Sequence, residues 1–193
     1  MTTEKRYEIL SSLPTYGPMY IPVTANGKPF YSEGFPVRFY KIDGTEWIAN
    51  FKPGWTDLKQ IIEFEKTQNL LVIACGTCYI MNPNDTKPIQ VFGASFSDIF
   101  KANKNRLVLQ DQTDLTIVEA DGTHWNTERI SMDGFSKIKV EKNLVLGLAS
   151  NPMHDADEWL EFKYDLDTKT LTGGSFYPSE NKNLSGKYDN RKV

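Results

Sequence analysis

One short segment of the 193-residue chain gathers an imidazole and several carboxylates. It contains His154, Asp155, Asp157 and Glu158. Such groups could bind a metal ion or act as a general acid and base pair, as in a metal-assisted hydrolase or lyase. Their spacing matches no known metal or catalytic motif. A solvated acidic loop is therefore the favoured interpretation, and the enzyme is the alternative.

Two cysteines, Cys75 and Cys78, are a second candidate group. A Cys-x-x-Cys pair can be a redox couple or half of a zinc site. Gly76 and Thr77 lie between them, which predicts a hairpin turn with both thiols on one face. A redox couple would need a helix after the motif, where a strand is expected. A zinc site would need two further ligands, for which His154 and Asp155 are the candidates. Two reduced, inert thiols are the favoured prediction, with no metal and no cofactor.

The aromatic residue with the strongest case for binding is Trp55, in the segment Pro-Gly-Trp-Thr. An exposed tryptophan in a connecting loop can anchor a partner, although it can equally close the end of a core. Trp47 and Trp125 recur in matching contexts and are predicted to pack between sheets. His124 stands where its counterpart is Glu46, which predicts a solvent-facing strand residue.

A repeat determines the elements that would position these residues. The tracts Asp43-Gly-Thr-Glu-Trp47 and Asp121-Gly-Thr-His-Trp125 each follow an apolar run, as expected of a strand, a tight turn and a second strand. Three further apolar runs begin with Asn69, Asn105 and Asn143. These runs begin at nearly equal intervals along the chain. A repeat of this kind, with four short strands in each unit, is typical of the blade of a β-propeller.

The predicted fold is all-β, with about four repeated antiparallel sheets in a small β-propeller-like arrangement. An open stack of sheets or a β-sandwich is the alternative. In the first unit, strands are expected at Met19–Thr24 and Lys28–Ser32, as irregular edges rich in proline. A single domain is predicted over residues 1–177, followed by a polar, disordered tail over 178–193. The units cover about 16–53, 56–93, 96–132 and 135–177.

Register then places the candidate residues. Successive turns of a four-stranded meander alternate between its two edges. The turns Cys75–Cys78, Asp111–Asp114 and Asn151–Glu158 are therefore expected on one rim, together with the connection that carries Trp55. The Asp-Gly-Thr turns face the opposite way. The Asn151–Glu158 turn is longer than its two counterparts, and insertions in repeat proteins often mark the binding face. This favours the rim that carries the Asn151–Glu158 turn.

The Asp43-Gly-Thr-Glu-Trp47 and Asp121-Gly-Thr-His-Trp125 tracts, with Asp165-Leu-Asp-Thr-Lys169, resemble the repeats of PQQ-type and WD40-like propellers. The resemblance implies stacked four-stranded sheets. The chain has too few units for the central quinone channel, so no cofactor is implied. Tyr31–Phe35 through Trp47–Phe51, with Ile73–Tyr79, also resembles uncharacterised bacterial proteins, which implies no function.

The composition argues against several classes of binding partner. Charged residues make up 24% of the chain and the net charge is −3, so no basic surface is available for nucleic acid or for acidic lipid. No apolar stretch is long enough to cross a membrane, and two cysteines fit a reducing compartment, so a soluble, cytoplasmic protein is predicted.

The sequence contains no recognisable catalytic motif, which favours a non-enzymatic role. We predict a binding or scaffold protein that holds a protein partner on its loop-rich rim. A small-ligand sensor in which Trp55 stacks on the ligand is a third interpretation. The oligomeric state is left open. The predicted binding residues are Trp55, Asp111, Asp114, His154, Asp155, Asp157 and Glu158.

Overall fold

The computed structural model describes residues 5–17, 19–153 and 157–176, and this part of the chain forms four sheets of four strands each. The predicted tail over 178–193 lies outside the described residues. A single turn of 3-10 helix, η1 (Asn103–Asn105), connects β9 to β10. No helix in the described part of the chain has the length and apolar character needed to span a membrane.

The strands of each sheet are contiguous in the sequence. In the first sheet the spatial order is β1 (Tyr7–Ile9), β3 (Phe35–Tyr40), β4 (Glu46–Phe51) and β2 (Ile21–Val23). The second contains β5 (Lys59–Glu63), β6 (Leu70–Ala74), β7 (Thr77–Met81) and β8 (Gln90–Phe92). The third contains β9 (Asp98–Lys101), β10 (Leu107–Gln110), β11 (Leu115–Val118) and β12 (His124–Asn126). The fourth contains β13 (Phe135–Glu141), β14 (Leu144–Pro152), β15 (Asp157–Asp165) and β16 (Thr170–Gly173).

The first sheet differs from the prediction. Its edge strand β1 precedes the expected start of the unit at residue 16, and β2 runs parallel to β4, whereas the other three sheets are antiparallel meanders. The strand expected at Lys28–Ser32 does not form. Asn26 instead folds the backbone locally, because its Oδ1 accepts a 3.0 Å hydrogen bond from the amide of Lys28. A side-chain-stabilised turn competes here with strand pairing.

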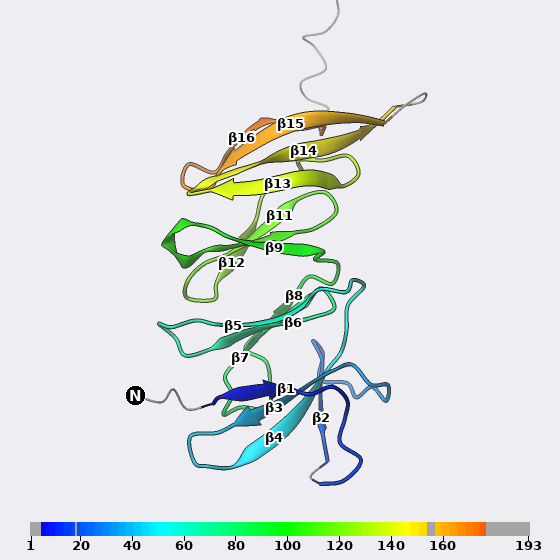
Figure 1. The fold of residues 1–193 in the computed structure, drawn as a ribbon, viewed down its shortest axis with the longest axis vertical. Coiled ribbons are helices and arrows are strands. Elements are labelled where there is room, and N and C mark those ends of the chain that lie inside the picture. The colour runs from blue at the N-terminus through cyan, green and yellow to red at the C-terminus, as the bar shows by residue number, and fades with distance from the viewer. Residues whose placement is uncertain (1–4, 18, 154–156, 177–193) are drawn as a thin grey trace, which may run out of the picture.

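The sheets follow one another along the long axis of the molecule (Figure 1). One apolar cluster lies between the first and second sheets, one between the second and third, and one between the third and fourth. None of these clusters joins the first sheet to the fourth in the described residues. The structure therefore confirms an all-β chain of four repeated sheets, and it does not confirm a propeller.

The repeated Asp-Gly-Thr turns are built alike. Asp43 Oδ1 accepts hydrogen bonds from the amide and the hydroxyl of Thr45, at 2.9 and 2.6 Å. Gly44 has a φ of +82°, a backbone angle that glycine adopts without steric cost. The following Trp47 is buried between sheets, and its Nε1 donates to the carbonyl of Pro83 at 2.8 Å. The predicted packing role of Trp47 is confirmed.

Candidate functional site

The candidate site is one edge of the stack, which we call the loop-rich rim. Hydrogen bonds connect its consecutive segments. Across the first two sheets, the amide of Gly54 donates to the carbonyl of Ala74, and that of Trp55 donates to the carbonyl of Ala94 at 2.8 Å. The rim consists of residues 52–58, 75–76, 93–97, 111–114, 127–134 and 151–153.

The same bracing continues toward the fourth sheet. Ser95 Oγ donates to Asp111 Oδ1 at 2.7 Å, and Gln112 Nε2 donates to Asp133 Oδ1 at 2.9 Å. The amide of Gly134 donates to the carbonyl of Gln112. The expectation that the Cys75–Cys78 and Asp111–Asp114 turns share one rim with the sheet connections is therefore confirmed.

Trp55 is the most prominent side chain of this rim. It is 86% exposed, which excludes the alternative that it closes the end of the core. Beside it is a hollow of about 400 Å³ between the first two sheets, lined in part by Pro53, Tyr79 and Val91. The hydroxyl of Tyr79 donates to the carbonyl of Lys52 at 2.7 Å, which holds the wall of the hollow in place.

The backbone that carries Trp55 is tightly enclosed. A Cβ added at Gly54 would lie 2.6 Å from the carbonyl oxygen of Cys75 and would also collide with that of Ala94. Only glycine fits this contact without a shift of the backbone. Trp55 is thus an exposed aromatic side chain on a constrained segment, which reduces the ordering cost of binding a partner.

The cysteine turn differs from the prediction by one residue. Cys75 and Gly76 form the two-residue turn, with φ angles of +50° and +88°, and Thr77 already pairs with Ala74 in the sheet. Cys78 therefore lies in the core between the second and third sheets, where burial raises the pKa of its thiol. Only Cys75 lies at the rim, so the two thiols cannot act together there as metal ligands.

The two aspartates of the β10–β11 turn have different environments. Asp111 accepts hydrogen bonds from Ser95 Oγ and from the amide of Gln112, so it braces the rim from within. Partial burial, and then the charge of Asp111, raises the pKa of the Asp114 carboxyl. Both lie on the rim as predicted, and Asp111 is engaged by protein donors.

Part of the acidic segment cannot be placed. His154 and Asp155 lie outside the described residues, and only the backbone pairing of Asp157 with Pro152 is described. Glu158 is exposed and accepts a 3.1 Å hydrogen bond from Asn151 Nδ2. Within the described residues, no group of three or more His, Cys, Asp and Glu side chains could hold a metal ion.

His124 corrects a further prediction. It does not face solvent as an isolated strand residue, because its ring stacks on Phe92 of the neighbouring sheet, with centroids 3.8 Å apart and an interplanar angle of 13°. Its buried Nδ1 has no hydrogen-bond partner in the described residues. Burial lowers the pKa of this imidazole, so the neutral ring is favoured in the folded protein.

We expect this imidazole to make stability depend on pH. As the pH falls below about 6.5, the unfolded chain binds a proton at His124 that the folded chain resists. The free energy of unfolding should therefore decrease as the pH falls from 6.5 toward the lower folded-state pKa of His124. Urea titrations at a series of pH values would measure this slope. His124→Phe should flatten it, and equal slopes in wild type and variant would contradict the interpretation.

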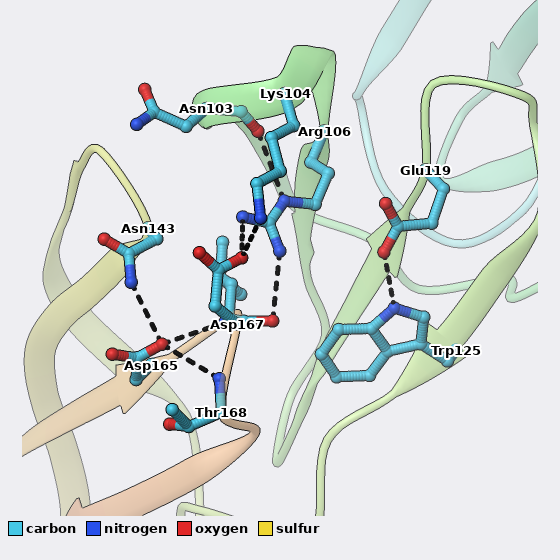
Figure 2. A network of polar contacts seen from close by, with 10 residues as sticks. Asn103, Lys104, Arg106, Glu119, Trp125, Asn143, Asp165, Asp167 and Thr168 are labelled. Carbon is cyan, nitrogen blue, oxygen red and sulfur yellow. Dashed lines mark hydrogen bonds and ion pairs between the residues drawn. The ribbon is translucent and has the colours of Figure 1, made fainter.

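The opposite rim carries a network that the sequence did not reveal (Figure 2). The side chain of Arg106 is 4% exposed, and its Nη2 donates to Asp167 Oδ1 at 2.7 Å. Its Nη1 donates to the carbonyl of Leu166 and its Nε to that of Asn103, at 3.0 and 3.2 Å. Lys104 Nζ reaches the same Asp167 oxygen at 2.9 Å. Lys104 and then Arg106 hold the pKa of Asp167 below its ordinary value.

This network joins the third and fourth sheets and is structural rather than a second site. A hollow of about 260 Å³ lies next to it, lined in part by Glu63, Lys66 and Lys101 as well as Arg106. All three donating nitrogens of Arg106 are already bonded to protein oxygens. The described contacts of the guanidinium thus hold the third and fourth sheets together.

No protein-family model and no curated protein matches the chain. The similarity to propeller repeats therefore stays a prediction. The features that carry a functional argument are the exposed Trp55, the hollow beside it and the hydrogen-bonded backbone of the rim.

Proposed function

We propose that this chain is a non-enzymatic binding or scaffold protein that holds a protein partner on its loop-rich rim. The observation that carries the proposal is Trp55, 86% exposed beside a hollow of about 400 Å³. Tryptophan is enriched among the residues that dominate protein interfaces. Two further apolar side chains of the rim, Met132 and Met153, are 41% and 59% exposed.

The rigidity of the rim supports the same proposal. Trp55, Cys75 and Asp111 stand on segments that hydrogen-bond to the next sheet, so the surface is ordered before a partner arrives. A preformed surface loses less conformational entropy on binding than a flexible loop. The hollow next to Trp55 would accept an apolar side chain of the partner.

Two further inferences concern the repeat family and the cellular location of the protein. We infer a relation to β-propeller repeats, supported by four-stranded units that pack face to face through successive apolar clusters. We infer a cytoplasmic location, supported by two free cysteines, Cys75 and Cys78.

We expect Trp55→Ala to abolish capture of the partner and to leave folding intact. The side chain is almost fully exposed, so its removal should change the free energy of unfolding by less than about 0.5 kcal/mol. Co-purification of the tagged full-length chain from its native cell, compared with wild type, would measure the loss. Ile42→Ala is the matched control, because Ile42 is 92% exposed on a turn of the opposite rim. An unchanged set of captured proteins in Trp55→Ala would exclude the rim as the binding surface.

A further inference from the structure

The two ends of the stack have different outer faces. On the first sheet, the outer face is covered by polar side chains: Arg38 Nη1 lies 3.3 Å from Glu8 Oε2, and its Nε lies 3.5 Å from Glu46 Oε1. The hydroxyl of Tyr40 donates to the same Glu8 oxygen at 2.9 Å. Ile48 beneath this cover is 1% exposed. A polar outer face is what a terminal repeat needs to end a stack in water.

Within the described residues, no ion pair covers the outer face of the fourth sheet, which we call the end face. Val145 and Ala149 of β14 belong to the core between the third and fourth sheets. Because side chains alternate along a strand, Leu144, Leu146 and Leu148 lie on the opposite, outer side, and all three are half-buried. A leucine row thus runs along the centre of the last sheet.

The end face is also hollowed and extended. A hollow of about 880 Å³ is lined by Leu146 and Leu148, among others. Trp159 pairs with Ser150, and this register places it on the same side as the leucines, where it is 45% exposed. The apolar surface therefore continues toward the end of the long β14–β15 hairpin.

The charges of the end face form rows of opposite sign. Leu146 pairs with Lys139 on one side and Lys163 on the other, which makes a basic row. Leu148, two residues further on, pairs with Glu161, which makes an acidic row. Adjacent rows on one face are about 7 Å apart along the strand.

This pattern is complementary to itself. A twofold axis that lies across the strands between these two rows would reverse the strand direction of the second copy. The basic row of one copy, with Lys163, then lies opposite the acidic row of the other, with Glu161. The same operation brings Leu144 opposite the row that contains Trp159. An isologous interface requires this kind of self-complementarity.

We propose that two copies of this chain associate through their end faces. The contact repeats a fourth time the sheet-on-sheet packing that the chain already uses three times. It covers the half-buried leucine row and pairs the row of Lys163 with the row of Glu161. It leaves the loop-rich rim of each copy open, so it does not depend on the proposed function.

Sedimentation equilibrium of the full-length chain across a concentration series tests the dimer. Wild type is expected to approach twice the monomer mass of 22.0 kDa. Leu146→Glu places a carboxylate in the centre of the apolar contact and should give a monomer at every concentration. Ile42→Glu, on an exposed turn of the opposite rim, is the matched control and should dimerise like wild type. Circular dichroism of each variant shows whether its sheets are intact.

A charge exchange tests the orientation. Lys163→Glu alone, or Glu161→Lys alone, places like charges opposite each other twice in the symmetric dimer, so each should raise the dimer Kd about tenfold or more. The double variant with both exchanges restores opposite signs and should return the Kd toward the wild-type value. A double variant that is weaker than either single one would overturn the proposed axis.

Two results would overturn the dimer itself. One is a wild-type chain that remains monomeric throughout the concentration series. The other is a chain truncated after Phe176 that dimerises when the full-length chain does not, because residues 177–193 would then be the occupant of the end face. Trp55→Ala should leave the dimer Kd unchanged, so failure of the partner proposal and failure of the dimer are distinguishable.

Discussion

Arg106→Leu is expected to lower the free energy of unfolding by about 3 kcal/mol, because a buried side chain with several charged hydrogen bonds is lost. Leucine fills part of the space, yet the carbonyls of Leu166 and Asn103 lose their donors. Asp167 would also lose one of its two cationic partners. Urea denaturation monitored by tryptophan fluorescence measures the change.

The matched control is Lys104→Ala. Lys104 contacts the same Asp167 oxygen, but its side chain is 66% exposed, and an exposed ion pair contributes little. A much smaller loss is therefore expected from the control than from Arg106→Leu. Equal losses in the two variants would mean that charge on Asp167, and not the buried guanidinium, stabilises this edge of the stack.

Phe96→Ala is expected to be at least as destabilising, at about 3–5 kcal/mol. Phe96 is 2% exposed between the second and third sheets, with its ring centroid 6.1 Å from that of Phe92. A Cβ at Gly93 would overlap this ring, so the site is closely packed and truncation leaves a cavity. Thermal and urea unfolding of the variant measure the cost.

The same substitution should weaken the loop-rich rim. Thr56 Oγ1 donates to the carbonyl of Phe96 at 2.6 Å, which ties the segment next to Trp55 to the third sheet. Phe96→Leu is the control, because a large apolar side chain still fills most of the site and a cost below about 1.5 kcal/mol is expected. Partner capture should be retained in Phe96→Leu and reduced in Phe96→Ala. If a destabilised Phe96→Ala still captured the partner fully, binding would not depend on the packing beneath the rim.

The architecture was predictable wherever local signals repeat. Asp-Gly-Thr turns and runs led by Asn69, Asn105 and Asn143 together predict four units, because a strand and its turn depend mainly on nearby residues. The same local signals would be present in a ring or in an open stack. Closure depends on whether the first and last sheets meet, and no local pattern records that.

The candidate site was predictable in its location but not in its details. Strand alternation placed Trp55 and Asp111 on one rim correctly. The predicted cysteine turn was one residue away from the observed one. Both Cys75-Gly76 and Gly76-Thr77 fit a two-residue turn, and the observed turn has a positive φ at Cys75.

The sequence contained no signal for contacts between residues that are far apart along the chain. Arg106 and Asp167 are 61 positions apart, and the repeat pattern around each residue does not indicate the other. The stack of His124 on Phe92 joins two sheets in the same way.

The linear order of the sheets affects how the molecule folds and unfolds. Each sheet is formed by one continuous stretch of chain, and each apolar cluster joins only sheets that are consecutive in the sequence. Such a quasi-one-dimensional molecule can nucleate locally and grow by addition of one unit at a time. During synthesis, each sheet can fold onto the previous one as it emerges from the ribosome. Under tension between the termini, the stack would come apart from its ends, one sheet after another.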